Sequence, residues 1–150
     1  MILRDTLKNI LIASDHAGWN LKNHLIHSLN QLPWQDLGTH SSSESVDYPD
    51  ITDDLCQKLN PNDAGVLICG SGQGVAIRAN RYHHIRAALC WSEEVVRLAR
   101  AHNKANVICF GGRLMDFSLC EKMVLTFLDS PFEGGRHLRR VNKLLSINKR

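Results

Sequence analysis

Short apolar runs alternate with segments of helical periodicity along almost the whole chain, and this alternation limits the folds open to it. Apolar runs cover residues 10–13, 65–69, 86–90 and 105–110, with a weaker one at 35–37. Between them, apolar side chains recur at the three- and four-residue spacing of an amphipathic helix. Strands that alternate with helices are typical of right-handed βαβ units, which build a parallel sheet covered by helices on both faces.

The predicted helices fill the gaps between the strands. They are expected at residues 18–31, 51–59, 75–81, 92–103, 116–129 and from about 136 onward. Ser92, followed by two glutamates, is typical of a helix cap with an acidic first turn. No repeat or linker interrupts the pattern, and 150 residues suit one domain with its own core. We therefore predict one α/β domain over residues 1–150, a three-layer α/β/α Rossmann-like sandwich with a five-stranded parallel sheet.

Composition argues against several classes of protein. The five cysteines are an odd number and form no Cys-x-x-Cys pair, unlike a disulfide framework or a zinc ribbon. The formal charge of +3 suits an anionic metabolite but is too small to indicate nucleic acid. No apolar run approaches the ~20 residues that cross a bilayer, and no signal peptide is recognisable at the start. We therefore expect a cytoplasmic protein that binds neither membrane nor nucleic acid.

Polar residues gather near the ends of the predicted strands. Ser-Asp-His at 14–16 follows the first strand, Cys-Gly-Ser at 69–71 the third and Gly-Gly-Arg at 111–113 the last, while His-Asn at 102–103 ends the preceding helix. Ligands of open parallel sheets bind beyond the carboxyl ends of the strands. We expect all these residues on one rim, with two histidines suited to proton transfer beside Cys69.

The segment 70–74 has the pattern Gly-Ser-Gly-Gln-Gly. Alternating glycines let the backbone approach an oxygen-rich ligand, and the next helix adds N–H groups, which favours an anion or oxyanion cradle. The alternative is a tight strand-to-helix turn. Its spacing does not fit the dinucleotide pattern G-x-G-x-x-G. Cys69 could be a small buried hydrophobe, or a reactive group whose thiolate the loop amides stabilise. The other cysteines lack this setting and are interpreted as packing residues: Cys56, Cys90, Cys109 and Cys120.

The histidine pairs each have a purely structural alternative. Asp15 and His16 could form a helix cap beside an exposed histidine. His102 and Asn103 could be an ordinary helix C-terminus, which a cationic ring suits. The histidines show neither H-x-H nor H-E-x-x-H spacing, so no metal is expected and activity should survive chelation.

Two arginines near the C-terminus share a helix face. Arg136 and Arg140 are four residues apart, a spacing that can hold one phosphate from two directions. The rival interpretation is a basic tail that contacts nucleic acid or solvent. No aromatic residues interleave with these arginines, as single-strand binding would favour. Arg113 is a third candidate for the phosphate.

In this order, the motifs resemble the ribose-5-phosphate isomerase B family, which is related to the subunits of galactose-6-phosphate isomerase. The resemblance runs from about Asn9 to Val141. It rests on the segments 14–18, 38–39, 46–50, 68–74, 85–90, 98–103, 106–107 and 132–137. It implies an aldose–ketose isomerase that interconverts ribose 5-phosphate and ribulose 5-phosphate through a cis-enediolate, in the non-oxidative pentose phosphate pathway and without a cofactor. It also implies a homo-oligomer, dimer or tetramer, with active sites completed across a subunit interface.

The resemblance further implies a role for each site residue. Cys69 would be the base that moves a proton between C2 and C1, and His102 the acid that helps to open the furanose ring. Ser71 stands where threonine is common in the family and keeps its hydroxyl. A second branch of the family uses a glutamate base just after the glycine loop, where this chain has Val75. The expected substrate ligands are Asp15, His16, Gly70, Ser71, Gly72, Gln73, Gly74 and Asn103, with Arg113, Arg136 and Arg140 on the phosphate.

Two other functions stay open at this point. The chain could be one subunit of a galactose-6-phosphate isomerase, or another hexose-phosphate isomerase of the same fold. It could instead be a non-catalytic module that senses a sugar phosphate or a nucleotide. A sensor needs no carbon base, so the presence of Cys69 argues against the second alternative.

Overall fold

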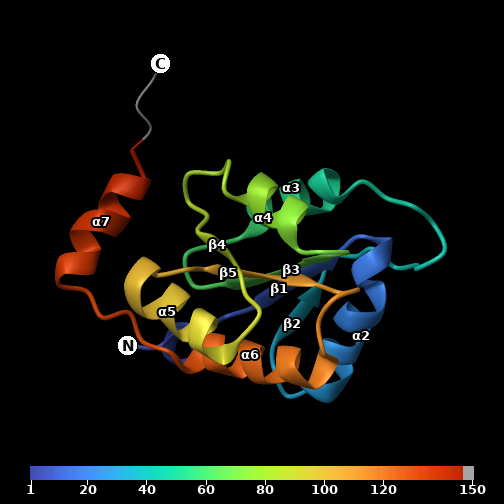
Figure 1. Ribbon diagram of the computed structural model, residues 1–150, viewed down its shortest axis with the longest axis horizontal. Helices are drawn as coiled ribbons and strands as arrows, with labels where there is room; N and C mark the ends of the chain where they lie inside the picture. The colour runs from blue at the N-terminus through green and yellow to red at the C-terminus, as the bar shows by residue number, and fades with distance from the viewer. Residues whose placement is uncertain (147–150) are drawn as a thin grey trace.

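A five-stranded parallel sheet forms the middle layer of the protein (Figure 1). This computed structural model describes residues 1–146, so residues 147–150 of the predicted domain lie outside the described part. The strands lie in the order β2-β1-β3-β5-β4, and each neighbouring pair is parallel. Their bounds are β1 Ile10–Ser14, β2 Trp34–Asp36, β3 Ala64–Cys69, β4 Ala87–Leu89 and β5 Val107–Gly111. The predicted sheet is confirmed.

Helices cover both faces of the sheet, as predicted (Figure 1). One outer layer contains α2 (Trp19–Ser28), α5 (Glu93–Asn103) and α6 (Phe117–Asp129). The other contains α3 (Tyr48–Lys58) and α4 (Gln73–Ala79). A 3-10 turn, η1 (His16–Gly18), precedes α2. Within residues 1–146, no helix combines the length and the apolar character needed to cross a bilayer.

The two ends of the chain add helices outside these layers. The C-terminal helix α7 (Arg136–Leu144) begins where the sequence predicts it and extends away from the sheet (Figure 1). The four-residue helix α1 (Leu3–Thr6) was not predicted, because one turn carries no apolar periodicity. It packs on α6, where Arg4 pairs with Asp129.

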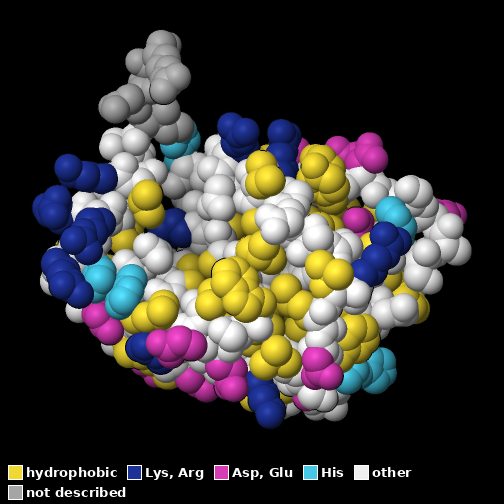
Figure 2. Space-filling model, in the orientation of Figure 1, with side chains coloured by type: hydrophobic (Ala, Val, Ile, Leu, Met, Phe, Trp, Pro, Cys, Tyr) yellow, Lys and Arg dark blue, Asp and Glu magenta, His cyan; other side chains and the backbone are white. Residues whose placement is uncertain are grey.

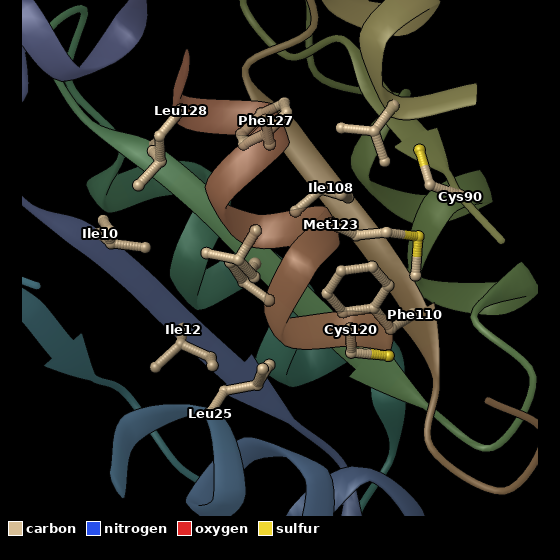
Figure 3. Close-up of a cluster of buried hydrophobic side chains, with 14 of the residues drawn as sticks. Ile10, Ile12, Leu25, Cys90, Ile108, Phe110, Cys120, Met123, Phe127 and Leu128 are labelled. Carbon is tan, nitrogen blue, oxygen red and sulfur yellow. The ribbon is translucent and has the colours of Figure 1, made fainter. Parts of the chain in front are cut away.

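Side chains of the central strands alternate between two hydrophobic cores. Ile10 and Ile12 of β1 and Phe110 of β5 face α2 and α6 (Figure 3). Leu67 and Cys69 of β3 face the opposite layer, toward α3 and α4. Burial on both faces explains why these strands read as continuous apolar runs. It also places the Cys69 side chain on the α3–α4 side of the sheet.

The chain changes winding direction between β1 and β3. After β1 it continues through α2 to the outer strand β2, whereas after β3 it continues through α4 to the other half of the sheet. The connections that leave the carboxyl ends of these two central strands therefore diverge. Open parallel sheets bind their ligands at such a point.

Candidate active site

The loops after β1, β3 and β5 are tied together by backbone hydrogen bonds. The N–H of Asp15 donates to the carbonyl oxygen of Ile68 at 3.1 Å, and the N–H of Gly112 donates to that of Cys69 at 2.8 Å. The main chain therefore fixes the position of Cys69 relative to both neighbouring loops. The predicted rim is confirmed for the residues that follow these three strands.

The Cys69 thiol faces the glycine loop. Its Sγ lies 3.2 Å from the backbone nitrogen of Gly72, which donates to it, and Cys69 is only 5% exposed. Gly72 has φ +80°, and a Cβ on it would lie 2.8 Å from the carbonyl carbon of Phe110. Only glycine fits this crossing between the loop and β5. The crossing holds an N–H against the sulfur, where it stabilises a thiolate.

The other four cysteines lie within the two cores, as predicted for packing residues. Burial raises the pKa of the Cys56, Cys90 and Cys120 thiols to about 12. Burial also raises the pKa of Cys109 well above its usual value. These thiols therefore hold almost no thiolate near neutral pH.

Alkylation of the native protein tests this difference. Because the thiolate is the nucleophile, we expect iodoacetamide at about pH 8 to modify Cys69 first. Peptide mass spectrometry after short exposure measures the order, with the denatured protein as the control in which all five cysteines react. Labelling of Cys90 or Cys120 in the native protein as fast as Cys69 would contradict the assignment.

Asp15 and His16 line the rim beside Cys69. The Asp15 carboxylate accepts the N–H of Gly18 at 3.1 Å and caps η1, as the structural alternative for this residue predicts. Nδ1 of His16 accepts the N–H of Val46 at 3.3 Å. In the neutral ring this places the proton on Nε2, which can donate to an anionic ligand.

Two further side chains border the glycine loop. Nη1 of Arg113 lies 3.6 Å from where a Cβ on Gly70 would be, which places the guanidinium at the rim as predicted. The ring of Tyr48 packs on Gly74, where a Cβ would come within 2.6 Å of it, and Tyr48 is 41% exposed. Sequence reasoning assigned Tyr48 no role. The sequence does carry a hint of this position, because Tyr48 is a large aromatic residue at a helix start that the proline at 49 marks.

The structure contradicts the expected position of His102 and Asn103. They end α5, which runs from the carboxyl end of β4 back to the amino edge of the sheet. At about 3.3 Å per residue, a five-residue strand such as β5 spans roughly 16 Å. His102 therefore cannot reach a substrate held at Cys69 of the same chain. The prediction failed because the helix of a βαβ unit returns antiparallel to the strands, so its end lies at the opposite edge.

His102 instead contacts the start of α7. Its ring stacks on that of His137, with centroids 4.2 Å apart and planes 8° apart. Burial lowers the pKa of His137, and the positive charges of His102 and Arg136 lower it further. Asn103 lines a pocket of about 370 Å³ on this side, together with Leu144.

Arg136 and Arg140 lie exposed in α7, four residues apart as predicted. Figure 2 shows Lys and Arg side chains gathered along this helix at the left of the view. The predicted residues thus form two groups on one chain. The carboxyl-edge group contains Asp15, His16, Cys69, Gly70, Ser71, Gly72, Gln73, Gly74 and Arg113, and the amino-edge group contains His102, Asn103, Arg136 and Arg140.

Comparison with known proteins identifies the family. Residues 10–144 match the family described as Ribose/Galactose Isomerase. The chain belongs to this family. A relative named probable ribose-5-phosphate isomerase B, from Mycoplasma genitalium, is 42% identical over 94% of this chain and 96% of its own length.

Solved structures of the ribose/galactose isomerase family have the same fold. Ribose 5-phosphate isomerase B from Anaplasma phagocytophilum matches with a TM-score of 0.88 at 42% identity, covering 93% of this chain and 97% of that one. The Mycoplasma genitalium enzyme with bound ribulose-5-phosphate matches with a TM-score of 0.83 at 41% identity, covering 91% and 93%. Both the predicted family and the predicted fold are confirmed.

Proposed function

We propose that the chain interconverts ribose 5-phosphate and ribulose 5-phosphate, as a cytoplasmic step of the non-oxidative pentose phosphate pathway. The observation that carries this proposal is the Cys69 thiol, held against the Gly72 amide at the point where ligands of such sheets bind. The structure of a family member with bound ribulose-5-phosphate supports the choice of substrate.

Cys69 acts as the base at carbon in this proposal. Its thiolate removes a proton from C2 of the open-chain aldose and returns it to C1 of the cis-enediolate, while the proton of the C2 hydroxyl passes to the oxygen on C1. Loop amides donate to the developing oxyanion, and one such donor is typically worth ~3–4 kcal/mol in the transition state. Ser71 Oγ accepts the N–H of Gln73 at 3.3 Å, which leaves the hydroxyl proton free for a substrate oxygen.

The amino-edge group completes the site from a second copy of the chain. Cys69 would then face His102 of the partner subunit, which donates a proton to open the furanose ring. Arg113 and the partner subunit's Arg136 and Arg140 would hold the phosphate dianion between them. Exposed apolar side chains accompany both groups, with Ile77 on α4 and Leu138 on α7, and contact with another copy would bury them.

Replacing Arg136 with alanine is expected to raise KM for ribose 5-phosphate about 10- to 100-fold, the equivalent of one charged hydrogen bond. The effect on kcat should be smaller, because the phosphate is remote from the reacting carbons. Steady-state kinetics measure the changes in KM and kcat separately. Arg139→Ala is the matched control, since it removes the same charge from α7 and should leave KM nearly unchanged. An Arg136→Ala enzyme with lower kcat and wild-type KM would contradict the assignment.

The proposed function is tested by offering the purified chain ribose 5-phosphate and, separately, galactose 6-phosphate. We expect ribulose 5-phosphate to form without any second protein. Turnover of galactose 6-phosphate that requires a second homologous chain would identify a hetero-oligomeric subunit instead. Binding of both phosphosugars with no turnover of either would favour a sensor.

A further inference from the structure

Three potential metal ligands converge where α5 ends and α7 begins. A ring nitrogen of His102, a ring nitrogen of His137 and a carboxylate oxygen of Glu133 all lie within 4.8 Å of one another. Two imidazoles and one carboxylate are a ligand set of known zinc enzymes, in which a fourth position stays open for water. We propose that His102, Glu133 and His137 bind a zinc ion, and that the bound ion inhibits the isomerase.

The spacing of these ligand atoms is close to that of a zinc site. Bonds of about 2.0–2.1 Å to a tetrahedral zinc separate the ligand atoms by roughly 3.4 Å. Oε2 of Glu133 lies 3.5 Å from Nε2 of His137 and 3.7 Å from Nε2 of His102. The stacked rings must turn so that both lone pairs point at one ion. The His102 side chain, 36% exposed at the edge of α5, has room to do so.

The backbone brings the three ligands together. The N–H of Glu133 donates to the carbonyl oxygen of Ala101 at 3.0 Å, which fastens this residue to the end of α5. Gly134 and Gly135 follow with φ +67° and +52°, a turn that glycine makes without strain. This turn directs the start of α7 toward the end of α5, so that His137, in the first helical turn of α7, lies near Glu133. Folding of the chain therefore positions the ligands without a metal.

Charges around the cluster select the kind of ion. Glu133 contributes negative charge at the cluster, and Glu94 of α5 lies close enough to act on His102. Arg136 and Arg140 lie close enough to act on His137 and oppose a cation. Arg97 of α5 also acts on Glu133. Hard cations such as Mg²⁺ and Ca²⁺ depend on several oxygen ligands, which the cluster lacks. Zinc binds well to imidazole nitrogen, so zinc should bind here and magnesium should not.

The inhibitory effect rests on the proposed function. We take Nε2, the ring nitrogen that faces Glu133, as the atom from which His102 donates the proton that opens the ring. A zinc ion on that nitrogen removes the proton that the reaction needs. The ion is therefore an inhibitor, and a chelator should restore activity rather than abolish it.

Calorimetric titration of the full chain with zinc chloride, in a buffer without phosphate, tests the site directly. We expect one zinc ion per chain. The Cys69→Ala variant should bind zinc with the same stoichiometry, which would exclude the reactive thiol as the zinc ligand. Glu133→Gln and His137→Asn should each weaken binding by about 10- to 100-fold or more. His24→Asn, which disrupts the surface pair of His24 with Glu121, is the control and should bind as the parent does. Equal affinity in the parent and Glu133→Gln, or heat from magnesium chloride, would overturn the site.

Activity measurements test the inhibition separately. Zinc at the concentration that fills the site should suppress isomerisation by the wild type, EDTA should restore it, and Glu133→Gln should resist. Full activity with the site occupied would overturn the inhibition. If the chain failed to isomerise ribose 5-phosphate at all, the calorimetric result would still stand, so failure of the proposed function is distinguishable from failure of the metal site.

Discussion

Replacing Cys69 with serine is expected to lower kcat for ribose 5-phosphate by about 100- to 10,000-fold, the range that a positioned general base contributes. A serine hydroxyl occupies nearly the same space but does not ionise near neutral pH, so no base faces C2. The amide of Gly72, which now donates to Sγ at 3.2 Å, stays in place and can still bind the substrate oxygen. KM should therefore change little. Coupled assays of both reaction directions measure these constants.

Cys90 offers a matched control for this substitution. It is a buried thiol in the opposite core, beyond the end of β4, and its Sγ donates to the carbonyl oxygen of Ala88. Cys90→Ala should cost about 1 kcal/mol of stability and leave kcat close to wild type. A Cys69→Ser enzyme that turns over at the wild-type rate would show that another group removes the proton.

Replacing His102 with glutamine is expected to remove most of the activity toward ribose 5-phosphate, with kcat/KM lower by about 100-fold or more. Glutamine can still form hydrogen bonds but cannot donate a proton to the ring oxygen. Ribulose 5-phosphate cannot form a furanose, because its C5 oxygen carries the phosphate. Its C1 proton should therefore continue to exchange with solvent deuterium in His102→Gln and not in Cys69→Ser.

This exchange separates a ring-opening role from a structural one. Loss of the stacked His102–His137 pair could loosen the start of α7, but that change would slow exchange and isomerisation together. Nuclear magnetic resonance of the C1 protons in D₂O measures the exchange. Equal loss of both activities in His102→Gln would contradict the assignment of ring opening to this residue.

The sheet and the carboxyl-edge group can be predicted from the sequence because both depend on local patterns of residues. The apolar runs of β3 and β5 are buried on both faces, and a glycine loop follows β3. The position of Cys69 then follows from the topology of parallel sheets. The four-residue helix α1 left no pattern to detect.

The amino-edge group could not be predicted in the same way. His102 was placed beside the strand that follows it in sequence, although a returning helix ends at the opposite edge. The contacts among His102, Glu133 and His137 depend on how α7 packs on α5, and their spacing matches no metal motif. A contact between two copies of a chain leaves no periodicity in either, so only the resemblance indicated a shared site.

Mixing the two inactive variants tests the central claim, that Cys69 and His102 act on one substrate from different copies of the chain. Cys69→Ser and His102→Gln proteins are each assayed alone, then mixed in equal amounts and allowed to exchange subunits. If each site is shared between two copies, random exchange makes half of the subunit pairs mixed, and each mixed pair holds one site with both residues intact. We expect recovery of about a quarter of wild-type activity. No recovery, once mass spectrometry has shown mixed oligomers, would contradict a site shared between copies.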